Sequence, residues 1–199
     1  MKIETDRLIL RKPRISDCPD IVEGVGEYDV AKRTANVPYP YQKADGDIYI
    51  KKSLKNWGKS SYAFVIELKA EKKVIGVMSL ESVNVFAGTA VTGSWINKKY
   101  WRQGYITEAK IVVNDFAFDT LKLRRLNSTV NTDNKASNVT QRKMGYLHEG
   151  ILRKGARSLA TGKIHDLNMY GLLESDWRKV RKKLSKQQSL RVEALLYSI

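Results

Sequence analysis

Residues 92–109, TGSWINKKYWRQGYITEA, are the stretch from which the rest of the chain is interpreted. Their pattern predicts a strand that ends at Ile96, a short basic loop, and a helix that begins at about Gly104. A helix N-terminus offers unpaired N–H groups and the positive end of the helix dipole, which suits a pyrophosphate. Arg102, Lys98 and Lys99 add positive charge. Taken alone, the same letters also describe an ordinary strand-to-helix turn.

Outward from this stretch, the apolar residues follow strand and helix periods in turn. The sequence predicts strands at 4–13, 62–68, 74–83, 88–96, 124–130, 145–153 and 163–172. It predicts helices from Ser16 to about Gly26, from Lys43 to Trp57, from Gly104 to Thr120, from Asn134 to Gly145 and from Asp176 to Leu184. This order predicts one domain over residues 1–184 with a mixed α/β sheet, and a separate C-terminal extension at 185–199.

Composition excludes several classes of protein. One cysteine in 199 residues rules out an internal disulfide framework and a cysteine zinc site, and two histidines make no histidine-rich metal centre, so no metal is expected. No apolar run is long enough for a membrane span, and the N-terminus lacks the apolar core of a signal peptide. We therefore expect a cytoplasmic protein.

The net charge of +15 predicts an anionic partner, such as a ribosome, a nucleic acid or a phosphorylated small molecule. No RNA-binding motif accompanies the charge, so a solvated basic surface is the simpler alternative. The apolar residues in 185–199 are compatible with a short amphipathic helix for docking or for a homodimer. A frayed C-terminal tail is an equally good interpretation of this segment.

The loop WRQGYI resembles the acetyl-coenzyme A loop of the GNAT N-acetyltransferases, whose pattern is Arg/Gln-x-x-Gly-x-Gly/Ala. More specifically, YW..GY.TEA is similar to the branch that holds the ribosomal-protein alanine and serine N-acetyltransferases. Other blocks match in order: TDRLILRK (5–12), IGVMSL (75–80), NKAS (134–137), MGYLHEGILRK (144–154) and HDLNMYGLLESDW (165–177). The resemblance covers essentially residues 3–184. Trp101, Arg102 and Ile106 depart from the loop pattern.

The resemblance implies an α/β (α+β) GNAT fold: a mostly antiparallel sheet of about seven strands, four to five flanking helices, and two strands that splay apart at the cofactor. It implies acetyl-CoA as the cofactor. The implied cofactor-binding residues are Trp95, Ile96 and Asn97 through their main chain, the loop residues Arg102, Gln103, Gly104, Tyr105, Ile106 and Thr107, and Asn134 and Ser137 at the next helix.

The implied reaction is direct attack of an amine on the acetyl thioester, with Ser137 as the acid that protonates the departing sulfur. An N-cap Asn134 with a first-turn serine is the alternative for NKAS. The resemblance does not identify the general base. A glutamate is the candidate base in part of this branch, but the matching position here is about Ala156, so that carboxylate is absent. The other candidates in this chain are Glu81, Glu149, His148, Asp166 and His165. We predict that no single carboxylate is indispensable.

The leading interpretation is therefore an acetyl-CoA-dependent N-acetyltransferase that modifies a protein N-terminal α-amine, as the ribosomal-protein enzymes do. A small-molecule amine such as an antibiotic or amino acid is the second candidate acceptor. A non-catalytic acyl-CoA-binding or ribosome-associated module is the third interpretation.

Overall fold

The computed structural model describes residues 1–184, so the predicted extension at 185–199 lies outside the described residues. A single sheet of eight strands organises the described chain, in the order β1-β2-β3-β4-β5-β6-β8-β7. The strands are β1 (Lys2–Glu4), β2 (Leu8–Arg11), β3 (Tyr62–Leu68), β4 (Lys73–Asn84), β5 (Thr89–Ile96), β6 (Arg125–Asn131), β7 (Leu147–Arg157) and β8 (Ile164–Leu173). Every neighbouring pair is antiparallel except β5 and β6.

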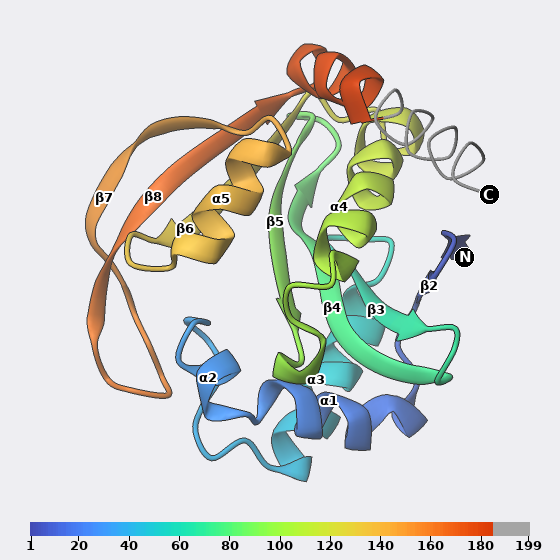
Figure 1. Ribbon diagram of the computed structural model, residues 1–199, viewed down its shortest axis with the longest axis vertical. Helices are drawn as coiled ribbons and strands as arrows, with labels where there is room; N and C mark the ends of the chain where they lie inside the picture. Colours follow the sequence, from blue (N-terminus) through green and yellow to red (C-terminus); the bar gives the residue numbers. More distant parts are fainter. Residues whose placement is uncertain (185–199) are drawn as a thin grey trace, which may run out of the picture.

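Six helices flank this sheet within residues 1–184. They are α1 (Cys18–Val25), α2 (Tyr28–Ala31), α3 (Lys43–Asn56), α4 (Tyr105–Asp115), α5 (Lys135–Lys143) and the helix 174–184. In Figure 1, α1 and α3 lie at one end of the view, α4 and α5 lie on either side of β5, and the hairpin β7–β8 curls away from the body. No helix in this part of the chain has both the length and the apolar character needed to cross a membrane.

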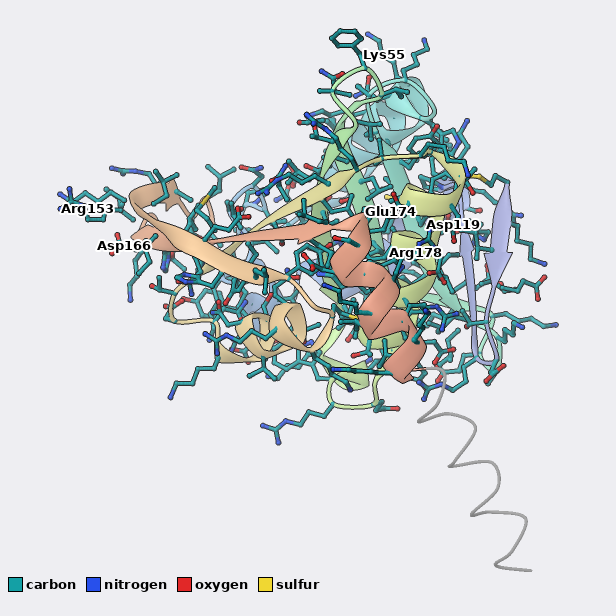
Figure 2. The ribbon with its side chains drawn as sticks, turned by 90° about the horizontal axis from the view of Figure 1, so that it is seen from above. Lys55, Asp119, Arg153, Asp166, Glu174 and Arg178 are labelled. Carbon is teal, nitrogen blue, oxygen red and sulfur yellow. The ribbon has the colours of Figure 1, made fainter. Side chains whose placement is uncertain are left out.

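Two apolar clusters, one on each face of the sheet, hold the layers together. Phe64 and Ile66 point into the larger cluster with α4 and the helix 174–184, whereas Val65 between them points into the smaller cluster with α1 and α3. This alternation follows from the two-residue period of a strand. Trp177 from 174–184 is fully buried, and its indole N–H donates to Asp115 Oδ1 over 2.9 Å. The same helix is fixed at its outer side by Arg178, which pairs with Asp119 and Glu174 (Figure 2).

The predicted GNAT-type fold is confirmed, with three differences in detail. The sheet has eight strands because residues 2–4 pair with β2 as an edge strand, through a turn in which Thr5 N donates to Leu8 O. The one-turn helix α2 lies in a segment predicted as loop. The helix predicted to run to Thr120 changes at Phe116 into a π-helical turn, Phe116–Thr120.

The predicted splay between two strands is also present. The parallel ladder between β5 and β6 contains only three residue pairs and ends at Val91↔Asn127. Beyond that point β5 continues to Ile96 and β6 to Asn131, each still paired with its outer neighbour. The Thr92 hydroxyl donates to Asn127 O over 3.3 Å, at the point where the backbone ladder stops. A wedge-shaped cleft therefore opens between the two strands toward their C-terminal ends.

Candidate active site

The backbone of β5 supplies the first wall of this cleft, and its register decides which groups are free. Asn97 N donates to Ile75 O over 2.8 Å, and Trp95 lies opposite Val77 in the same antiparallel register. Because alternate residues of an antiparallel strand bond to the same neighbour, Trp95 and Asn97 direct their N–H groups to β4. The N–H groups of Ser94 and Ile96 point the other way, into the cleft.

This register corrects part of the sequence-based set. Main-chain contacts from Asn97 are not available, because its N–H donates to Ile75 and its C=O accepts from Tyr100 N. Ile96 keeps a free N–H, although its C=O accepts from the Trp101 indole over 2.9 Å. Ser94, which the sequence analysis did not name, directs its N–H toward the cleft, whereas Trp95 directs its N–H toward β4. The Trp95 ring instead packs on α1, where a Cβ added at Gly24 would stand 2.7 Å from it.

The turn before α4 forms the outer end of the cleft. Gly104 is the N-cap of α4, with φ +83°, and no side chain caps the helix there. The first helical bond runs from Glu108 N to Gly104 O, which leaves the N–H groups of Tyr105, Ile106 and Thr107 without helical partners. A Cβ at Gly104 would meet only an Arg7 nitrogen, at 3.6 Å, so the space directly beside this residue is open.

Residues near the N-terminus hold this turn in place. The Arg7 guanidinium donates to Glu108 on α4 over 2.7 Å and to Gln103 O over 3.1 Å, and it lies 4.3 Å from the centre of the Tyr105 ring. The Thr5 hydroxyl donates to the other Glu108 oxygen over 2.6 Å. The TDR and TEA motifs therefore contact each other, and these contacts fix the position of the turn before α4.

The three cations of the loop have different partners. Lys98 pairs with Asp29 over 2.6 Å and Lys99 with Glu23 over 2.9 Å, so both point toward α1 and α2. These two lysines therefore do not add free charge to the turn, contrary to expectation. Arg102, at φ +64°, is exposed and has no carboxylate partner among residues 1–184. It is the loop cation that remains available to an anion.

The start of α5 forms the second wall. Asn134 is its N-cap, and its Oδ1 accepts from Ser137 N over 3.3 Å, which is the structural role considered for NKAS. Ser137 is partly exposed in the first turn of α5. Its assignment as the catalytic acid stays a prediction.

Arg33, in the turn after α2, connects the two walls. Its NH1 lies 3.4 Å from Asn134 Oδ1, and its guanidinium carbon lies 5.4 Å from the centre of the Trp101 ring. Its Nε donates to Asp29 O over 3.1 Å. Arg33 thus spans the mouth of the cleft and forms no ion pair within the described part of the chain. Nothing in its sequence context marked it.

A buried polar network lies at the base of the cleft, between α4 and α5. Lys110 on α4 is 2% exposed, donates to Gln141 Oε1 and lies 4.6 Å from the centre of the Tyr146 ring. Gln141 in turn donates to Ser128 Oγ on β6 over 2.7 Å. Burial lowers the pKa of Lys110 to about 7, because no carboxylate compensates for lost hydration.

The candidate bases differ in how they are engaged. Glu149 forms a forked pair with Arg125, and this pairing lowers its carboxyl pKa, which weakens it as a base. Glu81 accepts from Ser79 Oγ over 3.0 Å, and Asp166 accepts from Lys154 N over 2.7 Å. His148 is exposed and bonds Asn168 over 3.0 Å. His165 alone of these has a buried atom, Nε2, without a hydrogen-bond partner.

Comparison with known proteins agrees with this geometry. The model of the acetyltransferase (GNAT) domain matches residues 7–147. The chain is 28% identical to the N-acetyltransferase YoaA of Bacillus subtilis over 179 residues, covering 86% of this chain and 96% of that protein. It is 27% identical to the ribosomal-protein-serine acetyltransferase of Escherichia coli over 110 residues, covering 55% of this chain and 60% of that protein. The crystal structure of ribosomal-protein-S5-alanine acetyltransferase from Vibrio fischeri shares the fold, with a TM-score of 0.77 at 18% identity and coverage of 89% and 98%.

The chain belongs to the GNAT family of acetyltransferases. It is an acetyl-CoA-dependent N-acetyltransferase, which moves the acetyl group of the thioester to an amine. The residues present fit this cofactor: the donors before α4 and Arg102 suit its pyrophosphate, and the N–H groups of Ser94 and Ile96 suit an extended amide arm.

Proposed function

We propose that this N-acetyltransferase acts on the N-terminal α-amine of a protein held in an anionic assembly, as the names of the two ribosomal-protein relatives suggest. The observation that carries this proposal is the charge around the cleft. Glu23 and Asp29 are paired with lysines, whereas Arg33 and Arg102 form no ion pair within residues 1–184. The proposal concerns only the acceptor, since the acetyl donor follows from the family.

The carboxylates beside the cleft mouth are already neutralised by lysines of the protein. Glu23 bonds Lys73 and Lys99, and these contacts lower its pKa to about 2. Asp29 pairs with Lys32 and Lys98, with the same effect on its pKa. A polyamine acceptor needs several free carboxylates, so this surface disfavours it.

The other side of the cleft also carries cations that lack an ion pair within residues 1–184. The hairpin β7–β8 carries four exposed ones, Arg153, Lys154, Arg157 and Lys163, which we call the hairpin cations. Figure 2 shows Arg153 at the outer end of this hairpin, directed away from the body of the protein. Such a projecting basic hairpin favours an acceptor surrounded by phosphates or carboxylates.

An α-amine also suits the chemistry that the cleft provides. Its ordinary pKa is about 7.7–8.0, against about 10.4 for a lysine side chain, so it loses its proton more readily near neutral pH. The free N–H groups of Ser94 and Ile96 stabilise negative charge on the carbonyl oxygen under attack. Ser137, at the opposite wall, donates a proton to the departing sulfur.

The test is acetylation of a panel of peptides with different N-terminal residues, followed by mass spectrometry and by thiol release. We expect at least one peptide to be acetylated on its α-amine, with free amino acids and polyamines much poorer acceptors. Thiol release with small amines and none with peptides would support the small-molecule interpretation. Acetyl-CoA binding without thiol release from any amine would support a non-catalytic module.

Charge reversal separates the hairpin from the chemistry. In the double variant Arg153→Glu/Arg157→Glu, we expect activity on a short peptide to stay within about threefold of wild type. Activity on the same N-terminus presented in an anionic complex should fall at least tenfold. Equal losses on both substrates would contradict the assigned role of the hairpin cations.

A further inference from the structure

We propose that His165 accepts the proton that the attacking amine loses. Its Nε2 is buried and has no hydrogen-bond partner, one of only three such side-chain atoms among residues 1–184. Its other ring nitrogen, Nδ1, lies 3.7 Å from Asp133 Oδ2, and its side chain is 16% exposed. A buried ring nitrogen is normally paired, so an unpaired one calls for an explanation.

The fold places this imidazole at the open end of the cleft. Asn168 and Tyr170 of β8 bond to Asn138 of α5, so the even-numbered residues of β8 face α5. His165 therefore faces the opposite side of the sheet. There the tip of the hairpin meets the turn after α2, where Leu159 N donates to Ala35 O over 3.0 Å.

The cleft walls surround the same point. Asp133, the partner of His165, immediately precedes the N-cap Asn134, which Arg33 links to Trp101. Opposite His165 on β7 stands Ala156, whose side chain is small and uncharged. An amine that approaches from the α2 side therefore passes this imidazole on its way to the cleft.

The two ring nitrogens have the environments that a general base needs. A carboxylate at Nδ1 favours the tautomer with its proton there, which leaves Nε2 as the acceptor. Asp133 is the charged group in contact with the imidazole among the described residues. Ala156 across the strand is uncharged, and neighbouring Asp166 is engaged with Lys154 N.

The ammonium form of the acceptor gives one proton to Nε2, and the nitrogen pair that this frees forms the C–N bond to the acetyl carbon. The C–S bond breaks and its electron pair stays on sulfur. The nitrogen loses a second proton as it becomes an amide, which balances the proton that the sulfur takes up, and His165 returns the first proton to solvent. No oxidant or further reactant is required. The inference rests on the transferase activity of the family and not on the choice of acceptor, so any accepted amine can be used to test it.

The chain supplies its own control, because it contains only two histidines. In His165→Gln, we expect kcat/KM to fall about 100-fold or more at pH 7, within the usual range for loss of a general base. The loss should shrink toward pH 9, where the amine deprotonates in solvent. The affinity for acetyl-CoA, from calorimetry, should remain unchanged. His148→Gln, at the exposed histidine, should retain the wild-type rate and pH profile.

Two further variants distinguish proton transfer from a structural role. Asp133→Asn should lower kcat/KM by about tenfold, because the carboxylate no longer favours the required tautomer. Adding Ala156→Glu to His165→Gln places a carboxylate directly across the strand and should restore part of the activity.

The proposal is overturned if His165→Gln stays within threefold of wild type with the same pH profile. It is equally overturned if this variant and His165→Asn both lose acetyl-CoA affinity and melting temperature in step with activity. Failure of every protein N-terminus as an acceptor would refute the proposed function alone, since the comparison can then be made with a small amine.

Discussion

Replacing Lys110 by methionine should change how the stability of this protein depends on pH. The side chain is fully buried, and its pKa is lowered to about 7 by desolvation, against an ordinary value near 10.4. Between these two values the unfolded chain binds one more proton at this position than the folded chain does. The free energy of unfolding therefore rises with pH by about 1.4 kcal/mol per unit through this window.

The magnitude follows from that slope. From pH 7.5 to 9.5, Lys110 should add about 3 kcal/mol to the stability of the wild type, and below pH 7 its contribution should level off. Methionine fills a similar volume and carries no proton, while all other groups titrate equally in both proteins. The substitution also leaves Gln141 Oε1 without its donor, which costs about 1–3 kcal/mol. This cost is the same at every pH, so it changes the size of the free-energy difference between the two proteins and not its slope with pH.

The assay is urea denaturation of both proteins at half-unit steps from pH 6 to 9.5. The wild-type value minus the Lys110→Met value should be flat below pH 7 and should then climb. Lys110→Arg is the matched control, because an arginine stays charged throughout and should give no slope relative to methionine. A wild-type-minus-methionine difference that stays constant over the whole range would refute the reasoning.

Three further outcomes are expected at the cleft. Gly104→Asp should reduce acetyl-CoA affinity at least tenfold in calorimetry. The substitution strains a residue at φ +83° and brings a negative charge to the N–H groups that suit the pyrophosphate. Undiminished binding would show that this turn is not part of the site. Arg102→Ala should raise the KM of acetyl-CoA several-fold, because this exposed loop cation has no carboxylate partner among residues 1–184, and should leave the KM of acetyl-pantetheine, which lacks the phosphates, nearly unchanged. Equal shifts of the two KM values would argue against phosphate contact. Glu149→Gln should keep kcat within about tenfold of wild type, since this carboxylate is held by Arg125, and a loss beyond 1000-fold would make it the base.

Much of the architecture could be predicted because it depends on local periodicity. The apolar residues at 62–68 and in the helix from Lys43 already have the spacing of a strand and of a helix in the sequence. Gly145 follows α5 with φ +84°, as is usual for a glycine at a helix C-terminus. The edge strand β1 could not be predicted in this way. Its three residues have no period of their own and are strand only because β2 pairs with them.

The position of the cofactor site stays a prediction, and the structure shows which of its main-chain groups are already paired. Whether Trp95 or Ser94 presents a free N–H depends on the register against β4, which is a tertiary property. The partner of Lys98 could not be predicted either, because Asp29 is 69 residues away in the sequence. The burial of Lys110 depends on its contact with Gln141 of α5, which the local sequence of α4 does not indicate.

The short parallel ladder between β5 and β6 has a consequence for cooperativity. Among residues 1–184, three backbone residue pairs and the Thr92–Asn127 hydrogen bond join β5 to β6. The larger apolar cluster and the Trp177–Asp115 hydrogen bond also span this seam. An acyl donor bound along this seam would contact both halves of the sheet and add to these links. We therefore expect acetyl-CoA to raise the melting temperature of both halves together.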